Sequence, residues 1–419
     1  MMIGFKTKLR ANNAQSSLLT HWSNARRYAY NYALALSLIE QETLPEGEKW
    51  KLSQINEYDK YFNQGKIELG KKRGTTSGEI IGSGIHTWLR GIPGSVCQEA
   101  IKSDLKFAWQ RCFKKLGGRP KFQSKYRVKS FKLSNKDLKK DKNLNEDGSY
   151  INHNRLGKFK LGDKIPKKIL SGKLMNTTFS KSGKDWYVAF IFEIPDEDYF
   201  EISKTRTMCV GVDLGVAQHA TCYDEVSDTA WHEDYPKENL KVVEDRIRIL
   251  QRKMSKCKKG SLRYKKLSGM IAQRKSKQGN IRQDACHKLT KKLSTKAYKI
   301  VLEDLKVSNM IKSAKGSADE PGKNVKAKSG LNREILNMSL HSVKMQLGYK
   351  TIRYGSELIL VNPAYTSQTC SCCGHVSKEN RKTQAKFICV ECGHSDNADI
   401  NAAKNILKKG LNSANSSVE

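Results

Sequence analysis

Two cysteine pairs near the end of the chain constrain its fold more tightly than any other feature. Cys370-x-x-Cys373 and Cys389-x-x-Cys392 are separated by fifteen residues, and a glycine follows each pair. Four thiolates at this spacing close a tetrahedral Zn²⁺ site that leaves no position for water. The sequence therefore predicts one structural Zn²⁺, with Gly374 and Gly393 allowing each knuckle to turn tightly.

The remaining cysteines do not extend this pattern. Cys372 is adjacent to Cys373, so both cannot join a regular knuckle with Cys370, and Cys372 is predicted to be a spectator. The other six are scattered singly and are expected to be reduced, each a small buried apolar side chain or a free thiol rather than a metal ligand. They are Cys97, Cys112, Cys209, Cys222, Cys257 and Cys286.

The charge balance indicates a polyanionic partner. Lys and Arg number 77 against 42 Asp and Glu, a net charge of +35 that is spread along the chain. Such an excess favours nucleic acid, whose phosphates release counterions when they are neutralised; a merely basic surface or an anionic membrane is the alternative. No apolar run of about eighteen residues and no export signal are present, so we expect a cytoplasmic protein with no membrane partner.

The first half of the chain reads as a small β domain interrupted by helices. Residues 3–10 alternate like a strand, residues 14–39 and 95–116 have helical periodicity, and residues 174–194 read as two strands around Ser182-Gly183. Residues 117–135 alternate basic and aromatic side chains, which suits either nucleic-acid contact or an edge strand. Candidate nucleic-acid contacts are Arg26, Arg27, Arg119, Lys121, Phe122, Lys125 and Arg127.

The second half begins with residues 208–224, which read as a strand, a turn and a second strand. A paired-helix pattern follows Pro236, and its returning helix has an outer face loaded with Lys and Arg. Such a face is commonly only solvated, but with this net charge it is a candidate wall of a nucleic-acid groove. A further helix is predicted from Asn332 to about Tyr349.

Three acids occupy positions from which metal chemistry could be built. Asp213 follows the apolar strand CVGV, Glu303 follows IVL, and Asp399 lies at the start of the helix DINAAKNIL. Each alone could be a solvated or capping residue. If the two strands are neighbours, however, the acids form an all-oxygen site that suits Mg²⁺ or Mn²⁺, and two such ions could support phosphodiester hydrolysis. Asp396 is expected to cap the helix.

Several long motifs resemble one family. VGVDLGV, IVLEDL, GLNREIL, YTSQTCSCCGHVSKENRKTQAKFICVECG and NADINAAKNIL closely resemble the transposon-encoded TnpB (OrfB) family of RNA-guided DNA endonucleases. The resemblance covers residues 210–407, and a weaker one extends to ARRYAYNYAL, GGRPKFQSK and TFSKSGKDWYVAF. Residues 41–95 depart most from the family pattern, being longer and richer in loops.

The resemblance implies an α+β and α/β multidomain fold. A split β-barrel wedge domain would comprise residues 1–13 and 117–200, and a helical recognition insert residues 14–116. A RuvC-like RNase H-fold nuclease would comprise residues 205–365 and 396–408. The zinc ribbon, a target-nucleic-acid-binding insert, would comprise residues 366–395, and residues 409–419 would be a tail.

The resemblance also implies the chemistry. Asp213, Glu303 and Asp399 would be the catalytic carboxylates that hold Mg²⁺. A guide RNA from the transposon end would pair with one strand of double-stranded target DNA beside a short motif read by the protein. One protein per RNA is expected, with a dimer as the alternative. Other readings are a miniature type V CRISPR effector, an RNA-guided repressor without cleavage, which would need a lost acid, and a transposase proper.

Overall fold

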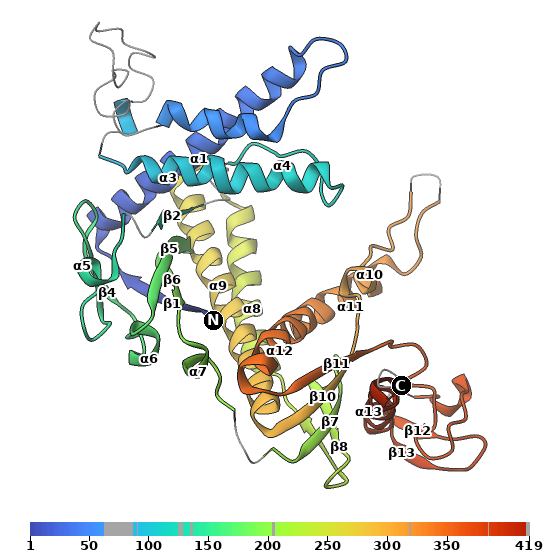
Figure 1. Ribbon diagram of the computed structural model, residues 1–419. Helices are drawn as coiled ribbons and strands as arrows, with labels where there is room; N and C mark the ends of the chain where they lie inside the picture. Colours follow the sequence, from blue (N-terminus) through green and yellow to red (C-terminus); the bar gives the residue numbers. More distant parts are fainter. Residues whose placement is uncertain are drawn as a thin grey trace, which may run out of the picture. The chain divides into compact units, whose positions relative to one another are not determined.

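The structure, a computed structural model, divides into two compact units, Met1–Tyr199 and Phe200–Glu419 (Figure 1). Each unit has a sheet of its own. The described residues are 1–62, 87–89, 91–124, 129–134, 137–202, 206–317, 320–383 and 385–415. Among them, no helix combines the length and the apolar character needed to cross a bilayer.

The sheet of the first unit has six antiparallel strands in the order β2-β5-β6-β1-β4-β3. They are β1 (Met2–Arg10), β2 (Ser130–Ser134), β3 (Tyr150–His153), β4 (Gly157–Leu161), β5 (Lys173–Ser182) and β6 (Asp185–Glu193). Within the described residues the sheet is open between β2 and β3. The structure thus shows a split six-stranded sheet, and its closure into a barrel stays a prediction.

Along the sequence, a group of helices lies between β1 and the other strands of this sheet. They are α1 (Asn13–Glu42), η1 (Leu52–Phe62), η2 (Thr87–Leu89), α3 (Gly94–Glu99), the π-helical turn η3 (Ala100–Leu105) and α4 (Lys106–Phe113). Asn12 caps α1, accepting a 2.8 Å hydrogen bond from the Gln15 amide. The buried Trp22 of α1 packs against Phe131 of β2, with ring centroids 5.5 Å apart. Three short helices, α5 (Lys140–Asn143), α6 (Lys167–Leu170) and α7 (Asp196–Tyr199), complete the unit.

The sheet of the second unit has the order β11-β10-β7-β8-β9. Its strands are β7 (Met208–Asp213), β8 (Ala220–Asp224), β9 (Thr229–Glu233), β10 (Ala297–Glu303) and β11 (Glu357–Val361). β7, β10 and β11 are parallel, whereas β8 and β9 form an antiparallel extension. The carboxyl ends of the three parallel strands therefore lie at one edge of the sheet.

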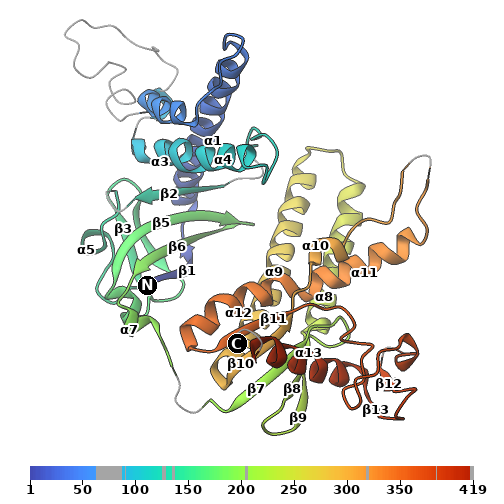
Figure 2. The same cartoon turned by 45° about the vertical axis from the view of Figure 1, so that its right-hand side comes forward.

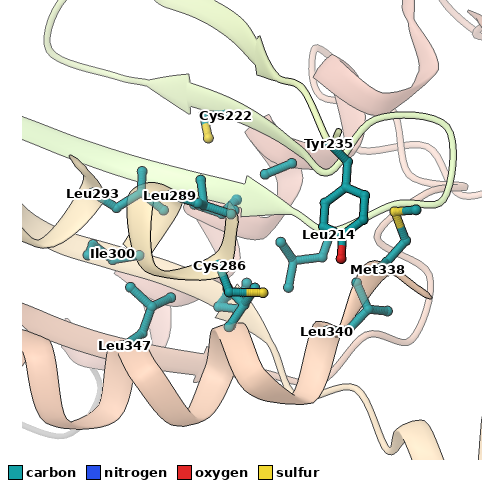
Figure 3. Close-up of a cluster of buried hydrophobic side chains, with 14 of the residues drawn as sticks. Leu214, Cys222, Tyr235, Cys286, Leu289, Leu293, Ile300, Met338, Leu340 and Leu347 are labelled. Atoms are coloured by element: carbon teal, nitrogen blue, oxygen red, sulfur yellow. The ribbon is translucent and has the colours of Figure 1, made fainter. Parts of the chain in front are cut away.

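Helices pack against both faces of this sheet. Val210, Val212 and Ile300 face a core that α9 (Leu262–Lys296) and α12 (Leu340–Tyr354) complete (Figure 3). Cys209 and Val301, which alternate with them, face α13 (Ala398–Asn415). α8 (Lys237–Ser255) pairs with α9 through a smaller apolar cluster. The remaining short elements are α10 (Val307–Met310), η4 (Lys378–Asn380), β12 (Lys386–Ile388) and β13 (Ser395–Asn397).

The single helix predicted from Asn332 to Tyr349 is wrong. The structure has two helices, α11 (Val325–Met338) and α12, which are separated by Ser339 in the left-handed conformation at φ 55°. The break is fixed by a tertiary contact, because the Tyr235 hydroxyl donates a 2.5 Å hydrogen bond to the Asn337 carbonyl. Helical periodicity continues through Ser339, so the pattern alone does not reveal the break.

Candidate active site and metal-binding cluster

Asp213 and Glu303, the acids at the ends of β7 and β10, lie at the carboxyl edge of the sheet of the second unit. β7 and β10 are parallel neighbours in which Val212 pairs with Leu302. The next residues along the two strands are Asp213 and Glu303, so both carboxylates stand at the same edge. The condition that the sequence left open, that the two strands be neighbours, is met by the structure.

Helix α13 brings the third acid to this edge. The helix packs on β7, β8 and β10, with Asp399 in its first turn (Figure 2). Gly211 makes the close approach possible, because a Cβ there would lie 2.2 Å from the carbonyl oxygen of Ala403. Gly410 has the same role toward β10, since its Cβ would lie 2.4 Å from a methyl group of Val301.

The electrostatics of Asp213 show that the three acids interact. Burial, then the nearby charges of Glu303 and Asp399, raise the pKa of Asp213 from 3.8 to about 7, and Arg381 opposes the rise. Carboxylates that cannot all be ionised together make a site that a cation would stabilise. The structure therefore brings the three predicted acids into one electrostatic unit.

Glu303 is held by a neighbouring hydroxyl. The Thr366 Oγ1 donates a 2.5 Å hydrogen bond to Glu303 Oε1. Burial raises the pKa of Glu303, whereas this hydrogen bond and the charge of Lys409 lower it. Thr366 lies after β11, so its contribution could not be assigned from sequence spacing.

Arg381 is a second residue that the sequence did not single out. Its Nη2 lies 2.9 Å from Asp399 Oδ1, and both side chains are about one-fifth exposed. In the sequence Arg381 stands among other cations of a loop, Lys378 and Lys382, with nothing to separate it from them. Only the folded ribbon places this guanidinium beside the acids.

The expectation that Asp396 caps α13 is wrong. Asn397 caps the helix, since its Oδ1 accepts hydrogen bonds from the backbone amides of Asp399 (2.9 Å) and Ile400 (3.2 Å). Asp396 lies one residue too early, in β13, and pairs with Lys404 at 2.9 Å. Asp399 is thus the aspartate that faces the other two acids, and Asp396 faces a lysine.

The four predicted cysteines come together. The sulfurs of Cys370, Cys373, Cys389 and Cys392 all lie within 4.8 Å of one another. Two of the S–S distances are 3.7 Å and 3.6 Å, close to the edge of about 3.8 Å expected for a tetrahedron with Zn–S bonds of about 2.3 Å. Among the described residues this is the one group of potential metal ligands so closely spaced, so the three carboxylates stand farther apart.

The knuckle geometry matches the glycine positions. Gly374 and Gly393 have φ of 79° and 71°, and each donates its amide to the carbonyl of the first cysteine of its pair, at 3.0 and 3.1 Å. Cys372 is exposed and lies outside the cluster. The four predicted ligands therefore lie together with Cys372 outside the group, and their binding of Zn²⁺ stays a prediction.

The candidate nucleic-acid residues of the first unit differ in their surroundings. Arg26 is committed internally, with its Nη2 2.5 Å from Asp104 and its Nη1 3.1 Å from Gln123. Arg27 is half-buried, whereas Arg119, Lys121 and Phe122 are exposed, Phe122 to 59%. Lys125 and Arg127 lie outside the described residues. Nucleic-acid contact stays a prediction for Arg119, Lys121 and Phe122. Arg26 instead pairs with residues of its own unit.

Three segments match known protein families. Residues 191–314 match the OrfB_IS605 family described as "Probable transposase", and residues 341–406 match "Cas12f1-like, TNB domain". Residues 1–41 match the OrfB_IS605 "Helix-turn-helix domain", although the structure has one strand and one long helix there.

A relative along nearly the whole chain decides the family. The protein named "Putative RNA-guided DNA endonuclease InsQ" of Escherichia coli (strain K12) is 34% identical over 406 residues, 97% of this chain and 92% of the relative. The chain belongs to the TnpB (OrfB) family. A TnpB-like protein of Acanthamoeba polyphaga mimivirus, L79, is 26% identical over 54% of this chain and 41% of its own length.

More distant similarity reaches CRISPR-associated proteins. The endodeoxyribonuclease Cas12f1 of Sulfoacidibacillus thermotolerans is 28% identical over 58% of this TnpB-family chain and 56% of its own length. The solved structure of CasPhi-2 (Cas12j) bound to crRNA covers 97% of both chains at 11% identity, with a TM-score of 0.45.

Proposed function

We propose that this TnpB-family chain is an RNA-guided endonuclease that hydrolyses phosphodiester bonds of double-stranded DNA in a metal-dependent reaction. One observation carries the proposal: Asp213, Glu303 and Asp399 converge at one sheet edge, where the last two raise the pKa of the first. The InsQ relative, named for the same activity, matches 97% of this chain.

The residues at this edge fit a hard divalent cation. Their donors are carboxylate oxygens, which Mg²⁺ and Mn²⁺ prefer, and their mutual repulsion falls when a cation is bound. Asp213, Glu303 and Asp399 would hold the metal, which would polarise the phosphodiester and lower the pKa of a bound water. The RuvC-like assignment of this unit belongs to the same proposal.

The protein's own side chains would prepare the site. Thr366 fixes the orientation of Glu303 through its hydrogen bond to Oε1. Arg381 supplies positive charge beside Asp399 and is a donor suited to a phosphate oxygen. Burial of Asp213 keeps water from screening these charges, so each acts more strongly on the reacting phosphate than it would in solvent.

The four-cysteine cluster fits a structural Zn²⁺. It offers four sulfurs at tetrahedral spacing and no fifth ligand position. The zinc would fix the ribbon that carries Arg381, and its contribution to catalysis would be indirect. Ser371 of this ribbon donates its amide to Asn401 of α13 at 2.9 Å, so the ribbon also contacts the helix that presents Asp399.

The guide and target assignments rest on family membership and on charge. A guide RNA from the transposon end would select the target by base pairing, and the protein would read a short adjacent motif. A miniature type V CRISPR effector is the alternative, favoured by the Cas12f1 similarity. A repressor without cleavage is disfavoured, because all three carboxylates are in place.

The test is cleavage by the protein purified with the transcript of its flanking DNA. A plasmid library with a randomised flank is incubated with this complex and Mg²⁺, and linear products are sequenced. We expect double-strand cleavage beside one short motif, abolished by EDTA and by Asp213→Ala. Cleavage that persists in Asp213→Ala would overturn the active-site assignment, and a preparation that retains no RNA would overturn the guided mechanism.

A further inference from the structure

The distal half of the α8–α9 hairpin carries an unusual concentration of one charge. Residues 246–277, here called the basic arm, contain thirteen Lys and Arg and no Asp or Glu. All thirteen side chains are exposed. Among the described residues, only Arg248 of the thirteen has a carboxylate within ion-pair distance, that of Asp245.

The charge is segregated along the hairpin. Residues 224–245, which lead into it, contain eight Asp and Glu against two Lys, and the sign reverses at Arg246. A requirement for solubility would be met by interspersed charges of both signs. An abrupt change of sign within one helix instead indicates that the distal part faces a polyanion.

Several cations of the basic arm lie at positions where they lower the stability of the helices that carry them. Arg263, Lys265 and Lys266 lie in the first turns of α9, which has no acid in its first turn, although the helix dipole favours anions there. Arg252 and Lys253 in the last turn of α8 suit the helix dipole, but Arg248, Arg252 and Lys256 follow at intervals of four residues, where like charges repel. Cations that oppose helix stability at several positions are explained by a partner that neutralises them.

The arm is nevertheless a built element. Val243, Ile247, Leu250 and Ile271 form an apolar cluster between α8 and α9, with Met254 and Leu267 packed against it. The two helices run side by side away from the sheet of the second unit (Figure 2). The apolar seam therefore holds the two helices together, with basic side chains on the outer face of each.

We propose that the basic arm binds the phosphate backbone of the guide RNA, independently of RNA sequence. Guide RNA is favoured over target DNA as the partner. A guide RNA that stays bound neutralises the repulsion among the cations of the arm throughout the life of the complex, whereas target DNA, which binds only transiently, leaves that repulsion in place between encounters. Neither base-specific contacts nor catalysis is required of the arm. The inference rests on the proposed function for the presence of a guide, but its readout is RNA binding.

The experiment compares two variants with the same change in net charge. The arm variant carries Gln at Arg252, Lys253, Lys256, Lys259, Arg263 and Lys266. The control carries Gln at Lys296, Lys306, Lys312, Lys315, Lys323 and Lys326, which are exposed in the same unit outside the arm. RNA affinity is measured with the flanking transcript across a range of salt concentrations, and thermal unfolding of the RNA-free proteins is recorded.

We expect RNA affinity of the arm variant to fall at least tenfold more than that of the control. The slope of log K against log salt should fall by roughly 0.7 to 0.9 for each removed phosphate contact. The RNA-free arm variant should melt at the same or a higher temperature than the wild type, because repulsion is removed. Equal losses in the two variants, or an unchanged slope, would overturn the proposal.

Two further measurements complete the test. The first distinguishes RNA from DNA as the partner of the basic arm, and the second distinguishes failure of this inference from failure of the proposed function. The arm variant, saturated with RNA, is tested for binding to a DNA duplex that matches the guide. Its affinity for this DNA should differ less than threefold from that of the wild-type complex. Loss of DNA binding with RNA affinity intact would overturn the assignment to RNA. A wild type that binds RNA through the arm but cleaves no DNA would refute the proposed function and leave this inference standing.

Discussion

Arg381 Nη2 lies 2.9 Å from Asp399 Oδ1, so a residue of the cysteine-bearing ribbon pairs with a carboxylate in the first turn of helix α13. The same guanidinium lowers the pKa of Asp213, which burial, Glu303 and Asp399 raise. A basic group is therefore already among the acids to which a divalent cation would bind. This pair connects the cysteine-bearing ribbon to the proposed chemistry.

Replacing Arg381 should separate metal binding from catalysis. In Arg381→Ala the acids lose their competing cation, so Mg²⁺ should bind several-fold more tightly in isothermal titration. Cleavage should nevertheless fall by about a hundredfold, the typical loss when one donor to a transition-state charge is removed. Arg381→Lys should recover part of the activity. Unchanged cleavage in Arg381→Ala would show that the guanidinium has no part in the reaction.

The two aspartates before α13 should differ sharply. Asp399→Ala should reduce cleavage to background, because it removes one of three carboxylates from the edge. Asp396→Ala should lose less than about threefold, since Asp396 pairs with Lys404 and exposed or partly exposed ion pairs contribute only about 0 to 1 kcal/mol. Both variants are assayed for plasmid cleavage under saturating RNA, and equal defects would contradict the assignment.

Removing one zinc ligand should unfold the ribbon locally. Cys389→Ser should abolish binding of one equivalent of Zn²⁺, measured by elemental analysis, because a buried ligand of the four-sulfur cluster is lost. Amide exchange should increase in residues 368–395. Cys372→Ser is the matched control and should retain the zinc. Zinc loss in the control would mean that Cys372 is a ligand.

The contact between β7 and α13 should be sensitive to a single methyl group. Gly211→Ala places a Cβ 2.2 Å from the carbonyl of Ala403, so the helix must move, and unfolding stability should fall by about 1–3 kcal/mol. Gly348→Ala, on the exposed face of α12 with nothing within 4 Å, should stabilise by about 0.5–1 kcal/mol. Chemical denaturation of both variants checks the difference. Equal effects would refute the close approach.

Lys350 should make the free energy of unfolding depend on pH in the alkaline range. It is buried at 7% exposure, donates to Thr290 Oγ1 at 2.7 Å, and burial lowers its pKa from 10.5 to about 8. Between pH 8 and 10.5 the unfolded chain then binds more protons at this residue than the folded chain, so its contribution to stability rises with pH. The free energy of unfolding of the wild type minus that of Lys350→Met should increase over this window. A flat difference would contradict the buried cation.

The sequence by itself determined the elements that depend on local pattern and composition. The strand patterns of residues 3–10 and 174–194, the paired-helix seam after Pro236 and the four-cysteine spacing all follow from side-chain pattern and ligand chemistry, and the structure has these elements. The positions of Asp213, Glu303 and Asp399 at strand ends and a helix start also follow from local pattern. Their grouping into one site rested on the condition that the two strands be neighbours, and the family resemblance assigned the same three residues as the catalytic carboxylates.

Tertiary structure alone decided which side chains meet. The parallel pairing of β7 with β10 and the close packing at Gly211 bring three distant acids together. The same packing places Thr366 and Arg381 beside them, and a separate long-range contact, from the Tyr235 hydroxyl to the Asn337 carbonyl, accompanies the helix break at Ser339. The physical reason is that hydrogen bonds and ion pairs between residues far apart in sequence depend on strand order and helix approach, and neither leaves a local periodic signal.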